Sequence, residues 1–354
     1  MKILAILLLF VPAAIAAELM HASPVMVFAL SALAIVPLSG YLGQATEEIA
    51  GYTGPTLGGL LNATLGNLAE LIIAILALRA GLVDLVKASI TGSILGNLVL
   101  VLGAAQLAGG LRHKTQRFSV ALAGLSISLL AVAVIGLVIP AIFHATHVDP
   151  TRELTRRVSI GVAALLMVGY GLSLLFQMGT HRSVFGESRA VADEAHADAH
   201  NGRWSLKRAV AILLLSAGAV GWLSEILVGS TEEAIKHTGL SEVFVGLIVV
   251  PIIGNAAEHS SAVMMAMRNR MDLAVSIAIG SSAQVALLIA PVLVFVGLAV
   301  GRPMDLAFTP FEVTAVALAV AVAMSVVRDA QSDWLEGAFL LLVYGMLGIA
   351  FFFY

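Results

Sequence analysis

The 354-residue chain is too apolar for an ordinary soluble protein, because hydrophobic residues make up 60% of it and charged residues only 12%. Soluble domains carry roughly 45–50% apolar and about 25% charged residues. We therefore expect an all-α polytopic membrane protein. The formal net charge of −3 indicates no particular partner, nucleic acid included, and the absence of cysteine excludes a disulfide framework, a thiolate metal site and a cysteine nucleophile.

Eleven apolar segments are long enough to cross a bilayer as helices. In chain order they cover residues 3–20, 24–43, 57–80, 87–110, 118–142, 158–177, 209–230, 241–267, 273–301, 306–327 and 334–353. The first segment also fits a cleaved secretory signal, because Lys2 precedes an apolar run that ends in small residues. We expect it to remain as an N-terminal transmembrane helix, 1–20, since the helix count and the charge distribution agree with an uncleaved segment.

One stretch of the chain occurs twice. A shift of 188 residues aligns 57–97 with 245–285 without a gap, so that Asn67 meets Asn255 and Glu70 meets Glu258. Two apolar segments of similar composition produce scattered Ala and Leu matches, but they do not produce aligned Asn and Glu. The alignment therefore indicates an internal repeat.

The repeat divides the chain into two units of five helices, 24–178 and 209–354, joined by a polar stretch, 179–208, that we expect to be a cytoplasmic linker. Because five is an odd number, the second unit must insert upside down relative to the first. Inverted repeats are typical of secondary transporters, whose substrate sites lie near the bilayer midplane where the repeats meet.

The basic residues are distributed unevenly between the two ends of these spans, which predicts an orientation by the positive-inside rule. Seven lie on one side: Arg79, Lys87, Arg152, Arg156, Arg157, Lys236 and Arg302. The N-terminal side collects twelve: Lys2, Arg112, Lys114, Arg117, Arg182, Arg189, Arg203, Lys207, Arg208, Arg268, Arg270 and Arg328. We therefore expect a cytoplasmic N-terminus and an outside C-terminus. The short loops and modest size of the chain favour a bacterial inner (cell) membrane as the location.

Glu70 and Glu258 are the residues most expected to carry function. An ionised carboxylate at mid-bilayer depth costs about 2.5–3.5 kcal/mol on insertion scales, so two in matched positions need an explanation. Asn67 and Asn255 each precede their Glu by three residues, which places amide and carboxylate on one helix face. The Gly before each Asn permits local unwinding, and Pro251 is expected to bend its helix.

Carboxylate, amide, hydroxyl and carbonyl groups are hard oxygen donors, which suit Ca²⁺. Ser93, Ser281 and Gln284 are expected to add such donors from the following helices, together with Asn97. Structural roles stay open: a lone Glu can bond a neighbouring helix, and small residues serve close helix packing. His259, which has no counterpart in the first repeat, is expected either to relay protons or to be a structural histidine.

The motifs Gly-Asn-Leu-Ala-Glu at 66–70 and Gly-Asn-Ala-Ala-Glu-His at 254–259 resemble those of the calcium/proton exchangers of the calcium–cation antiporter superfamily. The resemblance extends to GSILGN at 92–97 and MDLAVSIAIGSSAQ at 271–284. It implies the same arrangement of one extra helix followed by two five-helix repeats. It also implies ion binding by Glu70 and Glu258, with Asn67, Asn255, Ser93, Ser281 and Gln284 as polar liners. The linker departs from the densely acidic loop of many members.

These observations predict a transporter that is not an enzyme and needs no cofactor. Cytoplasmic Ca²⁺ would leave in exchange for H⁺ by alternating access, because two emptied carboxylates in apolar surroundings repel one another and take up protons. Sodium/calcium exchange on the same scaffold is the nearest alternative, followed by a passive channel. An intramembrane metal hydrolase is remote, since Asn255 stands where a metal-binding His is required. Beyond Ca²⁺, protons and the lipid bilayer, the sequence leaves homo-oligomerisation open.

Overall fold

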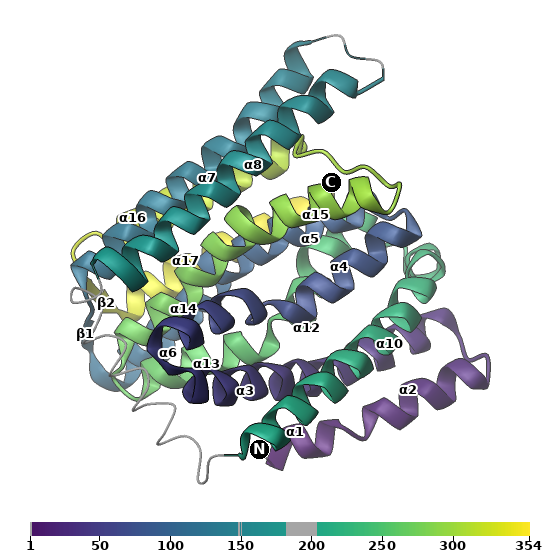
Figure 1. Ribbon diagram of the computed structural model, residues 1–354, viewed down its shortest axis with the longest axis horizontal. Coiled ribbons are helices and arrows are strands. Elements are labelled where there is room, and N and C mark those ends of the chain that lie inside the picture. The colour runs from purple at the N-terminus through teal and green to yellow at the C-terminus, as the bar shows by residue number, and fades with distance from the viewer. Residues whose placement is uncertain (1, 148, 150, 182–203) are drawn as a thin grey trace. The chain divides into compact units, whose positions relative to one another are not determined.

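The computed structural model describes residues 2–147, 149, 151–181 and 204–354. The described residues form helices joined by short turns and one two-stranded antiparallel sheet (Figure 1). The α-helices are α1 (Lys2–Leu7), α2 (Phe10–Leu19), α3 (Pro24–Leu65), α4 (Leu68–Ala80), α5 (Val83–Leu95), α6 (Leu102–His113), α7 (Val120–Thr146), α8 (Glu153–Leu175), α10 (Leu206–Thr238), α11 (Glu242–Phe244), α12 (Val250–Gly254), α13 (Ala256–Met267), α14 (Met271–Gln284), α15 (Ala290–Ala299), α16 (Pro310–Val326) and α17 (Trp334–Phe352). The strands are β1 (Thr115–Arg117) and β2 (Gln331–Asp333).

Among the described residues, seven helices are long and apolar enough to cross a membrane, or eight when the bent pair Glu242–Gly254 and Ala256–Met267 counts as one span. Two shorter apolar helices, Leu4–Leu19 and Pro310–Val326, accompany them. The prediction of a helical, multi-pass membrane protein is confirmed at this level. The linker prediction falls largely on residues 182–203, which lie outside the described residues.

The predicted boundary between the second and third spans falls inside a single helix, α3. The helix nevertheless folds back there, because a Cβ placed on Gly58 would lie 2.3 Å from the carbonyl oxygen of Ala50. In a straight helix these residues would be about 12 Å apart. Only glycine allows this approach, and Pro55, which lacks a backbone donor, falls between the two residues.

The part of the chain that the structure describes contains four π-helical turns: η1 (Gly96–Val101), η2 (Phe176–Thr180), η3 (Val245–Val249) and η4 (Val285–Ile289). η1 continues α5 into α6, and η4 continues α14 into α15. Because the 188-residue repeat relates α5 to α14, the two halves of the chain carry a π-helical turn at matching positions. Nothing in the sequence predicts these turns.

The chain divides into two compact units, each built from both halves of the sequence. The first falls within residues 1–89 and 197–257, where α3 packs along α10. Trp204 anchors this pair: it packs with Ala45 and Ala209, and its carbonyl oxygen accepts a hydrogen bond from the Tyr52 hydroxyl at 2.7 Å. Ser205 caps the start of α10.

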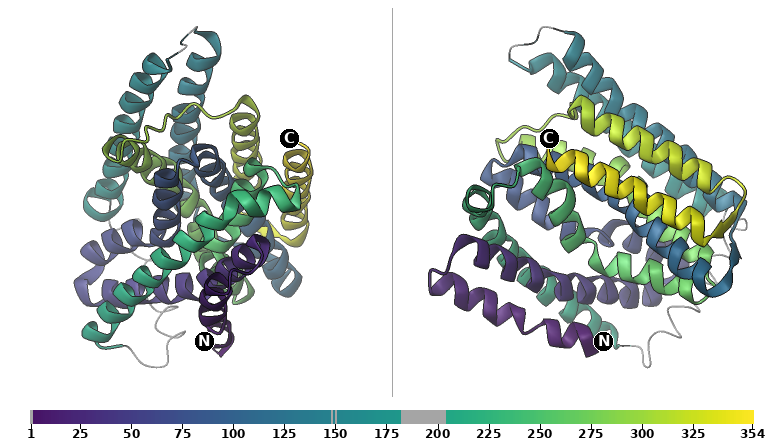
Figure 2. Two further views of the ribbon diagram at one scale, coloured as in Figure 1. Left: turned by 90° about the vertical axis from the view of Figure 1, so that its right-hand side faces the viewer. Right: turned by 180° about the vertical axis from the view of Figure 1, so that it is seen from behind.

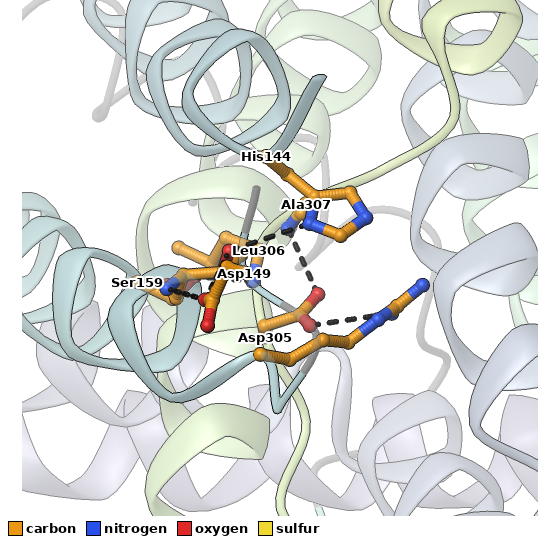
Figure 3. Close-up of polar contacts among 8 residues, drawn as sticks. His144, Asp149, Ser159, Asp305, Leu306 and Ala307 are labelled. Atoms are coloured by element: carbon orange, nitrogen blue, oxygen red, sulfur yellow. Dashed lines mark hydrogen bonds and ion pairs between the residues drawn. The ribbon is translucent and has the colours of Figure 1, made fainter. Parts of the chain in front are cut away.

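The second unit falls within residues 90–196 and 258–353. Its long helices α7 and α8 run side by side (Figure 1, Figure 2). The extended segment between α15 and α16 is buried against them: Leu306 donates its N–H to Ser159 Oγ at 2.9 Å, and Asp305 Oδ1 accepts from the Ala307 N–H at 3.0 Å (Figure 3). The sheet joins the turns before α7 and α17, with Gln116 opposite Ser332.

Candidate functional site

Both copies of the Gly-Asn-x-x-Glu motif interrupt a helix at the same residue. α4 begins at Leu68, immediately after Asn67, and α13 begins immediately after Asn255. The two asparagines adopt nearly the same backbone conformation, with φ −95° and ψ 25° at Asn67 and φ −107° and ψ 11° at Asn255. At Asn255 the two helix segments meet at an angle of 63°. The repeat seen in the sequence is therefore matched by a repeated backbone break.

The break places both glutamates at helix starts and agrees with the local unwinding expected at each Gly-Asn pair. Glu70 lies in the first turn of α4 and Glu258 in the first turn of α13. Asn67 and Asn255, however, precede these helices and do not share a continuous helix face with them. The first turn carries free N–H groups and a partial positive charge. Each carboxylate therefore lies where a helix start favours its negative charge.

Pro251 was expected to bend its helix, but the bend lies four residues later, at Asn255. Pro251 lacks a backbone N–H and lies two residues after the π-helical turn η3. The hydrogen bonds of η3 already differ from those of an α-helix. The Asn255 N–H still bonds to the Pro251 carbonyl oxygen at 3.0 Å. The chain therefore turns at the Gly-Asn pair and not at the proline.

The first unit brings one motif against the other. A Cβ placed on Gly254 would lie 3.7 Å from Cβ of Glu70, so the glycine of the second copy is in contact range of the glutamate of the first. Glu70, Asn67 and Asn255 are all buried, with exposed fractions of 4%, 3% and 2%. Burial of a carboxylate and two amides in an apolar protein is costly without polar or ionic partners.

The second unit places Ser281 directly on Glu258. The Ser281 hydroxyl donates a hydrogen bond of 2.7 Å to Glu258 Oε2. Ser93 is buried on α5, shortly before η1, and Gln284 is the last residue of α14, directly before η4. π-helical turns are often found at functional sites, and no residue pattern in these segments distinguishes such a turn from an α-helix.

His259 follows Glu258 in the first turn of α13. Its Nε2 is buried and has no hydrogen-bond partner among the described residues, and no hydrogen bond from His259 to Glu258 is found there. Asn97 is similar, because its Nδ2 is buried without a partner in the described part of the chain. The His259 Nε2 is thus available to donate or accept a proton, whereas the Asn97 Nδ2 can only donate a hydrogen bond.

The described residues contain no group of three or more His, Cys, Asp or Glu side chains arranged to hold a metal ion. The oxygen-rich residues that the structure does bring together are mixed: a carboxylate with a hydroxyl in the second unit, and a carboxylate near the Gly-Asn break in the first. Such donors suit a hard cation that is bound and released.

Comparison with known proteins assigns the family. The profile of the sodium/calcium exchanger protein family matches residues 23–179 and 208–353. The chain belongs to this family. Within it, a Ca²⁺/H⁺ antiporter of Aphanothece halophytica is 45% identical over 361 residues, which cover 98% of this chain and 95% of the relative. The Ca²⁺/H⁺ antiporter ChaA of Bacillus subtilis is 40% identical over 343 residues, which cover 97% of this chain and 96% of the relative.

A solved structure extends the likeness to the fold. The native structure of YfkE matches this exchanger with a TM-score of 0.85 and 36% identity, covering 99% of this chain and 100% of the other. The resemblance to calcium/proton exchangers that the two motifs indicated is thereby confirmed. The relatives of this chain are named as antiporters, so the chain is a membrane transporter and not an enzyme.

Proposed function

We propose that this exchanger carries Ca²⁺ across the membrane in exchange for H⁺, and that Glu70 and Glu258 are the carboxylates that bind the cation. The observation that carries the exchange reaction is the similarity over nearly the whole chain, 45% identity across 98% of its length, to a protein named as a Ca²⁺/H⁺ antiporter. Sodium/calcium exchange is not favoured, since relatives that are 45% and 40% identical to this chain are named for proton exchange.

The choice of carboxylates is supported by the repeated helix break. Each glutamate occupies the third position of a helix that starts at a Gly-Asn pair, and each lies among apolar spans where a charged side chain is rarely retained without function. We assign further oxygen donors to Asn67, Asn255, Ser93, Ser281 and Gln284. Two carboxylates balance the charge of one divalent cation, while amide and hydroxyl oxygens add coordination without adding charge.

The coupling to protons follows from electrostatics. When Ca²⁺ leaves, the negative charge of the carboxylates is no longer balanced, and an apolar environment favours their neutral, protonated form. The Ser281 hydroxyl can serve both states, because a hydroxyl donates to an ionised carboxylate and accepts from a protonated one. His259, with a buried Nε2, is a candidate for passing protons to Glu258.

We further propose eleven transmembrane helices, one N-terminal helix followed by inverted repeats at 24–178 and 209–354, with the linker 179–208 and the N-terminus in the cytoplasm and the C-terminus outside. One contact supports the inverted repeat: Ser282 Oγ donates to the carbonyl oxygen of Ile94 at 3.4 Å. These two residues are 188 positions apart, so equivalent positions of the two copies touch, as expected near a pseudo-twofold axis. Rocking of the repeats would give alternating access.

The test is Ca²⁺ flux into proteoliposomes under an imposed pH gradient, repeated under an imposed sodium gradient. We expect flux with the pH gradient only, and its loss in Glu70→Gln and in Glu258→Gln. Glu312→Gln is the matched control, because Glu312 is also buried but caps α16, a role that Gln can fill. Full exchange by Glu70→Gln or Glu258→Gln would refute the site, and flux driven equally by sodium would refute the proton coupling.

A further inference from the structure

Six helix ends of the second unit meet at one place. The turns that join them are tied together by hydrogen bonds: β1 pairs with β2, Gln116 Nε2 donates to the carbonyl oxygen of Ala266 at 2.9 Å and to Asn269 Oδ1 at 3.0 Å, and His113 Nε2 contacts the Met267 carbonyl oxygen at 2.9 Å. We call the surface formed by residues 111–120, 266–272 and 327–336 the strand face.

The strand face gathers basic side chains from three separate parts of the sequence. Five of them are exposed: Arg112, Lys114, Arg117, Arg268 and Arg328. Within the residues that the structure describes, none of the five takes part in an ion pair. The sheet and Gln116 join segments that are 150 or more residues apart in the sequence, so the tertiary fold creates this concentration of positive charge.

The acidic residues of the strand face are held by backbone N–H groups. Asp272 accepts from the Ser119 N–H, and Asp329 from the Gln331 N–H at 3.1 Å. Asp333 and Glu336 form a reciprocal capping box at the start of α17. Because each of these carboxylates stabilises a turn or a helix start, the exposed cations nearby are not neutralised by direct pairing.

At the opposite end of the same unit, by contrast, the arginines take part in ion pairs. There Arg152 pairs with Asp305 at 3.5 Å, and both Arg156 and Arg157 pair with Glu153. The close-up in Figure 3 shows Asp305, which also accepts the hydrogen bond from the Ala307 N–H. Three arginines at that end are thus paired with two carboxylates, whereas the five cations of the strand face stay available to an outside anion.

Exposed apolar side chains accompany the cations on the strand face. Leu111 is 69% exposed, Val120 67%, Trp334 48% and Leu335 42%. Tryptophan is enriched at the level of lipid headgroups, where its ring meets both apolar and polar surroundings. Basic and apolar side chains that alternate at the ends of membrane-crossing helices match the chemistry of a lipid headgroup region, with phosphate above and acyl chain below.

We propose that the strand face binds the headgroups of anionic phospholipids in the leaflet that it meets. In the orientation proposed above this is the cytoplasmic leaflet, and clustered Lys and Arg beside membrane helices are attracted to anionic lipid there. Because Gln116 and His113 also hold the C-terminal end of α13, the helix that begins beside Glu258, the bound lipid would steady the base of that helix.

Trp334 provides the probe. The full chain carries three tryptophans, so replacing Trp204 and Trp222 by Phe leaves Trp334 as the reporter. The protein is reconstituted in vesicles that contain brominated phosphatidylglycerol or brominated phosphatidylcholine, and quenching of Trp334 gives the relative binding constant of the two lipids. We expect phosphatidylglycerol to bind about threefold or more tightly than phosphatidylcholine.

Two triple variants decide the assignment. Arg112→Gln/Lys114→Gln/Arg117→Gln should bring the relative binding constant close to one. Arg79→Gln/Arg157→Gln/Arg302→Gln removes the same number of exposed charges elsewhere and should leave the preference intact. Equal binding of both lipids by the parent chain, or the same loss in both triple variants, would overturn the proposal.

A second measurement needs no tryptophan substitution. Each triple variant, and the unaltered chain, is extracted from vesicles of equal parts phosphatidylglycerol and phosphatidylcholine, and native mass spectrometry counts the lipids that remain bound. We expect the Arg112, Lys114 and Arg117 variant alone to lose retained phosphatidylglycerol. Equal retention by both variants would contradict the proposed surface even where the quenching signal is weak.

Discussion

Replacing Ser281 by alanine tests the Glu258 half of the site most directly. The Ser281 hydroxyl lies 2.7 Å from Glu258 Oε2, and a hydrogen bond to a charged group contributes about 1.5–3 kcal/mol. Because Glu258 is only partly buried, the lower end of that range applies. At 1.4 kcal/mol for each factor of ten, Ser281→Ala should raise the Ca²⁺ concentration for half-maximal flux about tenfold.

The neighbouring serine is the matched control. Ser282 donates to the Ala278 carbonyl oxygen at 3.0 Å, within its own helix, and forms no hydrogen bond with Glu258 among the described residues. Ca²⁺ titrations of proteoliposome flux at one fixed pH gradient should therefore show little change for Ser282→Ala, and Ser281→Thr should restore most of the affinity. Equal shifts for Ser281→Ala and Ser282→Ala, or no shift for Ser281→Ala, would refute the reasoning.

Two further predictions concern stability. A Cβ on Gly337 would lie 2.3 Å from the Leu107 backbone nitrogen, whereas a Cβ on Gly345, in the same helix, would meet nothing within 4 Å. Gly337→Ala should therefore lower the free energy of unfolding by about 1–3 kcal/mol, and Gly345→Ala should not. Thermal unfolding in detergent measures both effects. The N–H of Thr155 holds the pKa of Asp149 below its usual value, with help from the Thr155 hydroxyl. A lowered pKa stabilises the fold above the unfolded-state value and is lost as pH falls through the folded-state value, so Asp149→Asn should lower the melting temperature at pH 7 and have little effect near pH 3. An effect of equal size at both pH values would show that the carboxylate charge is not what matters.

The sequence by itself determined the class of protein, the internal repeat and the family. Composition and apolar run length are properties of the chain that no packing can alter, and aligned polar residues such as Asn67 with Asn255 stand out against an apolar background. These features sufficed to select Glu70 and Glu258, because a charged residue inside an apolar span is conspicuous without any knowledge of its neighbours.

Only the tertiary structure decided where the helices break and which side chains meet. An α-helix and a π-helical turn contain the same residue types, so the sequence around Gly96 and Val285 does not predict that η1 and η4 begin there. Beside the break at Asn255, Gly254 comes into contact range of Glu70, and the strand face depends on Gln116 reaching Ala266, 150 residues away. Contacts of this kind depend on packing between segments that are distant in the sequence, so the local hydrophobic periodicity does not predict them.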